Sequence, residues 1–459
     1  MTENYDVIDR MFAKIKIVKQ KLALSVNKIV PAIVSDSIQV FVMRIIVVAI
    51  GLTGNVLVAR YYGPATLGLL ALINSILVVV CMPSLLGLNV SILRIIPETQ
   101  KREGQGGVIS VFHKMLIIVS ATGVCVTIFA IILDQFVFED LFNEIIEPYL
   151  GFVFVAAILR GLIILITQYA RARKQIKKFL VLNVIPPMMI MFGYLIGVAH
   201  KASNESILKI YFISIYVSFF ILVLFIMKDV IKFKRLRMPQ SYHSFKSIIK
   251  MSLPMMVTIV VTALAEQFSI IYLSSSVSIS EVGIYSAAMK LSMLIGFSLK
   301  AVNTVIATRI AELHMQRHYD DMTQLSRMMS RFTFWCTLPF IILLYVYGRE
   351  ILTLIFGPPY TDAYGVLVVL LTAQFVNTAS GCTGIFLNMT GHQREFRNIM
   401  MLNAVIYIFL CIVLIPRFGI IGAACAFCFA EFFWNFMSLV FIKKIYGSSI
   451  HYLPFFVKN

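Results

Sequence analysis

The chain has 459 residues, of which 59% are hydrophobic and only 14% are charged, and its mean hydropathy is +0.89. A soluble protein cannot bury that much apolar surface, because soluble cores stop growing and split into domains. The composition therefore excludes a soluble domain. The apolar runs show no period-2 alternation, which indicates membrane-spanning helices whose backbone N–H and C=O groups are paired within the protein.

Residues 1–36 form a basic amphipathic segment. Apolar side chains recur at helical spacing between Met11 and Ile29, and lysines are interleaved with them. The segment lacks the short apolar core and small residues of a cleavable signal peptide. Its pattern predicts either a helix that lies on an anionic membrane face or a frayed basic tail.

Twelve apolar stretches of helical length follow along the chain. Gly63-Pro64 is a strong helix breaker and separates the first two. We therefore expect an all-α protein with about twelve transmembrane helices. The predicted spans are 37–60, 67–93, 110–133, 148–170, 179–199, 207–227, 251–273, 284–306, 332–348, 363–388, 399–415 and 420–441.

The distribution of Lys and Arg predicts how these spans are oriented, because cytoplasmic loops carry an excess of both. With the N-terminus inside, the inner loops and both tails hold 30 of these residues. The outer loops hold four, which are Arg60, Lys201, Arg349 and Arg417. We therefore expect both termini in the cytoplasm. This distribution also explains the net charge of +18 without nucleic acid as a partner.

A basic loop between the sixth and seventh spans divides the chain into two halves. A weak internal repeat supports this division, since the segment at 64–76 resembles the segment at 279–291 and aligns Gly68 with Gly283. Parallel repeats of this kind predict two lobes around a central cavity, and chance similarity between apolar segments is the alternative. The predicted units are an N-terminal segment 1–36, a six-helix lobe 37–227, a linker 228–250, a second six-helix lobe 251–441 and a tail 442–459.

Ionisable side chains inside the predicted spans are the candidate site residues, because a charge at a helix centre costs about 2.5–3.5 kcal/mol. Arg160 lies deepest, roughly 15 Å from the nearer interface, so its side chain cannot easily reach water. Arg44, Lys290 and Lys300 lie roughly 10 Å deep. We expect these four bases to line a hydrated cavity.

Two acids, Glu266 and Glu431, also lie within predicted spans. Four deep bases against two deep acids predict a cavity that attracts anions, such as phosphates or acidic sugars. The acids either form structural ion pairs with two of the bases or bind a coupling proton or sodium ion.

Motifs for catalysis, metals and cofactors are absent from the sequence. It contains no Walker A sequence, no GxGxxG loop and no GxSxG elbow. Cys425 and Cys428 have no second cysteine pair, and the residues between His314 and His318 lack the glutamate of a metalloprotease. We therefore predict no catalytic residues, no metal site and no cofactor.

Several stretches resemble bacterial polysaccharide biosynthesis membrane proteins. These are the lipid-linked oligosaccharide (O-antigen type) flippases of the multidrug/oligosaccharidyl-lipid/polysaccharide exporter superfamily. The resemblance spans about 37 to 445. Its most similar pieces are VLVARYYGPATLGLLALINSILVV at 56–79, MPSLLGLNVSILRIIPE at 82–98, ILTLIFGPPYTDAYGVLVVLLTAQF at 351–375, FLNMTGHQREFRNIMMLNAVI at 386–406 and LIPRFGIIGAACAFCFAEF at 414–432.

The resemblance implies a two-lobed, twelve-helix fold with a cationic cavity. It also implies translocation of an undecaprenyl-diphosphate-linked glycan across a bacterial inner membrane, with glycosyltransferases and a polymerase of the same pathway as partners. The residues that match the cationic cavity by depth are Arg44, Arg160, Lys290 and Lys300.

Two other functions are compatible with such a chain. A multidrug antiporter of the same superfamily exports organic cations, and this requires buried acids in the first lobe, where none lies deep. A membrane glycosyltransferase or polymerase usually requires a large outer loop, and the outer loops here are short.

Overall fold

A computed structural model describes residues 3–137, 147–231 and 243–452, and helices account for all the regular structure in these ranges. Residues 232–242 of the predicted linker 228–250 and residues 453–459 of the predicted tail 442–459 lie outside the described residues. The helices of the first half are α1 (Glu3–Ser84), α2 (Leu88–Val137), the 3-10 turn η1 (Glu147–Tyr149), α3 (Leu150–Ala172), α4 (Ile176–Ala199) and α5 (Asn204–Ile231). Those of the second half are α6 (Phe245–Ser276), α7 (Ile279–Ile295), α8 (Phe297–Met315), α9 (Tyr319–Phe356), η2 (Pro358–Ala363), α10 (Tyr364–Ser380), α11 (Thr383–Met389) and α12 (Gln393–Tyr446).

Three of the longest helices are each two helical legs joined at a glycine. The backbone φ angle is 81° at Gly63 in α1, 68° at Gly104 in α2 and 53° at Gly419 in α12. Only glycine adopts such positive values without a steric penalty, so these residues can reverse or bend the chain within a continuous apolar sequence. The predicted break at Gly63-Pro64 is therefore confirmed as the joint of α1.

The described helices are long and apolar enough for a multi-pass membrane protein. Within the described ranges, nine continuous helical segments meet the length and hydropathy of a membrane span, and the glycine joints divide some of them further. All twelve predicted spans are mostly helical, which confirms the all-α fold class. Short breaks interrupt three of them, at 85–87 in the span 67–93, at 296 in 284–306 and at 381–382 in 363–388. The number of crossings and the cytoplasmic location of both termini stay predictions.

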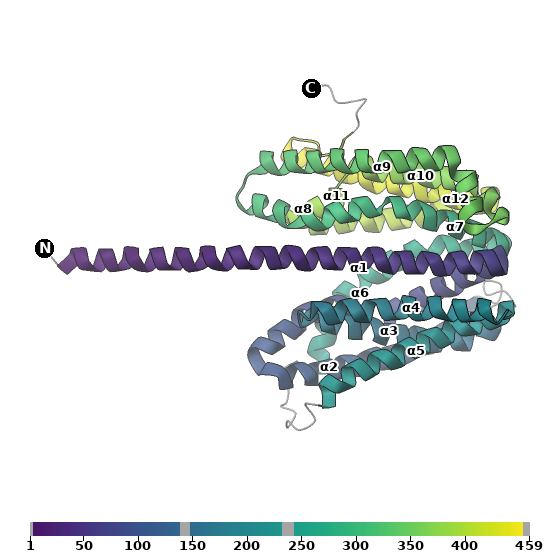
Figure 1. Ribbon diagram of the computed structural model, residues 1–459, viewed down its shortest axis with the longest axis horizontal. Helices are drawn as coiled ribbons and strands as arrows, with labels where there is room; N and C mark the ends of the chain where they lie inside the picture. Colours follow the sequence, from purple (N-terminus) through teal and green to yellow (C-terminus); the bar gives the residue numbers. More distant parts are fainter. Residues whose placement is uncertain (1–2, 138–146, 232–242, 453–459) are drawn as a thin grey trace.

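The helices gather in two groups with α1 and α6 between them (Figure 1). Helices α2–α5 lie together in the lower half of the view, and α7–α12 lie together in the upper half. We call α1–α5 the first bundle and α6–α12 the second bundle. The most extensive contacts between the two bundles are those of α1 with α7 and of α1 with α6. The exact lobe boundaries stay a prediction.

The contact between α1 and α7 is made by the two glycines of the sequence repeat. A Cβ atom on Gly68 would collide with the backbone oxygen of Ile279, and one on Gly283 would collide with the backbone oxygen of Pro64. The two helix backbones therefore touch without side chains between them. Near this crossing, Arg60 donates through Nε to the backbone oxygen of Ile355 at 2.8 Å. The bundles are thus closed against each other at the end predicted to face outward.

We expect the substitution Gly68→Ala to lower the thermal stability of the protein. The added methyl group must push α1 and α7 apart, and such overpacking costs about 1–3 kcal/mol. Gly365→Ala is the matched control, because a Cβ atom there meets nothing within 4 Å. Since alanine favours helix over glycine by about 1 kcal/mol, the control should be neutral or stabilising. Thermal unfolding in detergent measures both variants, and equal melting temperatures would contradict the tight crossing.

Candidate substrate cavity

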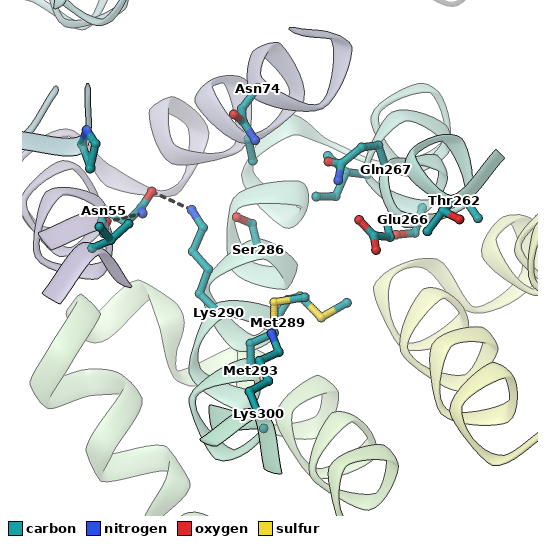
Figure 2. Close-up of a pocket in the computed structure, with 18 of the residues that line it drawn as sticks. Asn55, Asn74, Thr262, Glu266, Gln267, Ser286, Met289, Lys290, Met293 and Lys300 are labelled. Carbon is teal, nitrogen blue, oxygen red and sulfur yellow. Dashed lines mark hydrogen bonds between the residues drawn. The ribbon is translucent and has the colours of Figure 1, made fainter. Parts of the chain in front are cut away.

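A cavity of about 1040 Å³ lies between the two bundles. Its walls come from α1, α3, α4 and α5 of the first bundle and from α6, α7, α8, α10 and α12 of the second. Apolar residues and many polar side chains share the lining, and Figure 2 shows several of the polar ones. This size is typical of a ligand pocket, in which polar groups orient the ligand.

Arg160 projects into the cavity from the middle of α3. Small residues bring α3 close to its neighbours, since Ala156 and Ala157 are buried and a Cβ atom on Gly161 would come within 3.3 Å of Ser84 Oγ. The guanidinium Nη1 donates to Asn74 Oδ1 at 2.8 Å. Tyr211 donates its hydroxyl to the same oxygen at 3.5 Å. The hydrogen-bond partner of Arg160 in the cavity is therefore a neutral amide.

Lys290 reaches across the cavity from α7 to the first bundle. Its Nζ donates to Asn55 Oδ1 on α1 at 2.6 Å. The amide nitrogen of Asn55 donates to the backbone oxygen of Gly51 at 2.6 Å, which keeps its carbonyl oxygen turned toward the lysine. Figure 2 shows Lys290 extending toward Asn55, while Glu266 lies on the other side of the cavity. This second base is also held by a neutral amide.

Three further charges line the cavity wall of the second bundle. Glu266 is on α6, Lys300 on α8 and Glu431 on α12. Lys300 lies close enough to act electrostatically on both carboxyl groups, and Glu266 acts on Glu431. Lys300 also lies over the Phe297 ring, 5.4 Å from its centroid. The acids thus neighbour one base, while Arg160 and Lys290 face the first bundle.

Arg44 is not among the residues that line this cavity. It is exposed on α1, three residues before Val47, which does line it. The separation is about 4.5 Å along the helix axis. Arg44 lies near Arg171 at the end of α3, where the two charges act on each other. Its role in substrate binding stays a prediction.

The amides that hold the two bases were not among the sequence candidates. Asn55 and Asn74 lie within apolar stretches and line the cavity. Gln267 does so too, although its oxygen accepts from Ser75 Oγ and from neither base. Uncharged polar side chains inside spans also prefer the protein interior to lipid. A search for amides as well as charges in the spans would have found them. A metal site is not suggested by the described residues, since no three His, Cys, Asp or Glu side chains gather among them. The expected absence of a cofactor stays a prediction.

Solved structures of membrane transporters share this architecture. A multidrug resistance MATE family transporter of the MOP superfamily, in an inward-facing conformation, aligns with a TM-score of 0.71 and 12% identity over 87% of this chain and 94% of that chain. The lipid II flippase MurJ, in an inward closed conformation, aligns with a TM-score of 0.67 and 16% identity over 89% and 87%. A MOP superfamily transporter from Pyrococcus furiosus, described by the reverse polarity of its binding pocket, aligns with a TM-score of 0.61 and 12% identity over 91% and 95%.

At these identities the likeness shows the fold alone. The chain is a multi-pass membrane protein with the fold of these transporters and of this flippase. No curated protein matches the sequence. A family model described as polysaccharide biosynthesis protein matches residues 56–365. The chain therefore belongs to the polysaccharide biosynthesis protein family, which confirms that part of the resemblance seen in its sequence.

Proposed function

We propose that the protein is a flippase for an undecaprenyl-diphosphate-linked oligosaccharide, such as an O-antigen, capsule or exopolysaccharide repeat unit. One observation carries this proposal: Arg160 and Lys290 enter the cavity with neutral amides as hydrogen-bond partners, at 2.8 and 2.6 Å. An amide carbonyl orients a cation without neutralising it. The charge of both bases thus stays available to a diphosphate, for which Arg is a bidentate donor and Lys a point charge.

The physical task of such a flippase is to replace the water around a polar headgroup. A diphosphate-linked glycan cannot cross hydrocarbon unaided, because its polar groups would lose their hydrogen bonds. The cavity supplies cations and amides in place of that water, while the polyprenyl tail stays in the lipid. Rocking of one bundle against the other then exposes the cavity to each side in turn. The crossing of Gly68 and Gly283 is closed in the present conformation and must open for release.

The acids offer a means to drive the cycle. Glu266 and Glu431 line the same cavity as the bases and interact with Lys300. A coupling proton or sodium ion bound there changes the charge that faces the substrate. We therefore assign ion coupling to these acids. The bacterial inner membrane is the proposed location, and the proposed partners are membrane lipids and the glycosyltransferases and polymerase of the same pathway.

A multidrug or organic-cation antiporter is the second candidate function. The MATE fold and the two acids of the cavity favour it. However, both acids lie near Lys300, whereas Arg160 on α3 and Lys290 on α7 hold neutral amides of α1. An organic cation would meet two uncompensated positive charges there. A glycosyltransferase or polymerase receives less support, because the family and the structural neighbours are transporters and flippases.

A deletion strain and proteoliposomes together test the proposal. We expect deletion of the gene to abolish the surface glycan without raising sensitivity to cationic drugs. We also expect purified protein in liposomes to move undecaprenyl-diphosphate-linked oligosaccharide from the inner to the outer leaflet, where an added glycosidase or lectin detects it. Protein-free liposomes and liposomes with the Arg160→Gln protein are the controls. Drug hypersensitivity with normal surface glycan would instead support the antiporter.

A further inference from the structure

The second-bundle wall of the cavity is rich in buried hydrogen-bonding groups that other described residues leave unused. Five lining residues of this bundle each have a buried side-chain oxygen without a hydrogen-bond partner among the described residues. Gln374 is only 5% exposed and Asn403 only 9%. Buried polar groups are normally hydrogen-bonded, so a cluster of exceptions around one cavity points to a polar ligand. The five are Ser286, Asn303, Gln374, Asn377 and Asn403.

An aromatic ring is fixed beside these groups. Trp434 lines the cavity from α12, and its Nε1 donates to Glu431 Oε2 at 3.0 Å. The ring of Phe396 packs edge-on against the indole, with the centroids 6.2 Å apart and the planes at 72°. The backbone oxygen of Glu431 accepts from Asn435 Nδ2 at 2.9 Å, which secures this turn of α12. The indole therefore has a defined orientation at the cavity wall.

The unpaired side-chain oxygens, the carboxyl groups and the indole together match the chemistry of a sugar ring. Sugar hydroxyls both donate and accept, so they pair with amides and with carboxylates. The C–H face of the ring is apolar and packs on the negative face of an indole. A diphosphate offers only acceptors, and Glu266 and Glu431 would repel it from this wall. The sugar of a glycosyl diphosphate is thus expected to bind beside Trp434 and the acids, and the diphosphate is expected to bind away from them.

We propose that the wall formed by Trp434, Glu431 and the amides of the second bundle is a carbohydrate subsite. The diphosphate lies on Arg160 and on the ammonium group of Lys290, which extends from α7 toward Asn55 of the first bundle. This assignment rests on the proposed flippase function and goes further, because it gives the headgroup one orientation and makes the second bundle the part that reads the sugar. Residues on this wall then determine which repeat unit is carried, and Arg160 and Lys290 accept any diphosphate.

The chain contains two tryptophans, which allows a direct test. Trp335 is exposed on α9 and is not among the residues lining the cavity, so Trp335→Phe leaves Trp434 as the single reporter. This protein in nanodiscs is titrated with undecaprenyl diphosphate and with undecaprenyl diphosphate bearing a hexose, an N-acetylhexosamine or a hexuronate. We expect at least one glycosylated lipid to bind about tenfold tighter than the bare diphosphate and to change the emission of Trp434.

Matched variants separate the two walls. Trp434→Phe and Asn403→Leu should remove most of the tenfold gain in affinity that the sugar provides and leave the affinity for undecaprenyl diphosphate unchanged. Arg160→Gln should instead lower the affinity for the bare and the glycosylated lipids alike. Equal affinities for all four lipids, with a silent Trp434, would overturn the carbohydrate subsite alone. Binding of neither kind of lipid would overturn the flippase function as well. Tetraphenylphosphonium is the cationic probe, and its binding at Trp434 in place of the glycosylated lipids would likewise overturn the subsite.

Discussion

Replacing Arg160 by glutamine is expected to lower the rate of glycolipid translocation about 10- to 100-fold, since a hydrogen bond to a charged group contributes about 1.5–3 kcal/mol. The physical reason is the loss of one of the two cations that face the diphosphate. Glutamine keeps a long polar side chain, so Asn74 and Tyr211 retain a hydrogen-bonding neighbour. The measurement is leaflet exchange of undecaprenyl-diphosphate-linked oligosaccharide in proteoliposomes at equal protein content.

Two further variants show which property of Arg160 matters. Arg160→Lys keeps the charge but loses the planar pair of donors, so it should retain more activity than glutamine. Lys209→Gln removes a positive charge from the exposed surface of α5 and should leave translocation unchanged. If Arg160→Gln transported as fast as the unaltered protein while Lys209→Gln did not, the assignment of the diphosphate to this cavity would be wrong.

The fold was predictable from the sequence because lipid restricts the solutions. An apolar chain of this composition must form helices, and the structure has helix at every predicted span. The match of Gly68 with Gly283 also carried spatial information, since the two residues form the crossing of α1 with α7. The number of crossings was less accessible, because glycine joints such as Gly419 allow one continuous helix to hold two legs.

The candidate site was predictable only in part. The sequence gives the depth of a residue within a span, but it does not give the side of the helix that faces the cavity. Depth selected Arg160 and Lys290, and both line the cavity. Arg44 has a depth similar to that of Lys290, yet it lies beyond the lining residues and near Arg171. The phase of α1 relative to its neighbours depends on helix packing, which the sequence pattern does not show. The same limit concealed Asn55, whose partner is 235 positions away.

Substitution of Asn55 or Asn74 can neutralise the charge of Lys290 or Arg160 while both bases stay in place. We expect Asn55→Asp to lower glycolipid translocation about as strongly as the loss of Lys290 itself. The new carboxylate would stand where the amide oxygen lies 2.6 Å from Lys290 Nζ, and it would form a direct ion pair. At an effective dielectric constant of 20, two unit charges roughly 4 Å apart attract by about 4 kcal/mol. The lysine would then bind aspartate in place of a phosphate.

The outcome separates charge from shape, because aspartate and asparagine have nearly the same volume. Asn388→Asp is the matched control, since this residue lies on α11 and is not among the residues that line the cavity. Translocation of the glycolipid should fall for Asn55→Asp and persist for Asn388→Asp, with both proteins equally stable to heat.

Addition of Asn74→Asp should neutralise Arg160 as well, so the wall formed by Arg160, Lys290 and their two partners would bear no net positive charge. Such a cavity should bind tetraphenylphosphonium more tightly than the unaltered protein does, because the repulsion that disfavours organic cations has been removed. Unchanged glycolipid transport in the double variant would mean that the positive charge of this wall does not select the substrate.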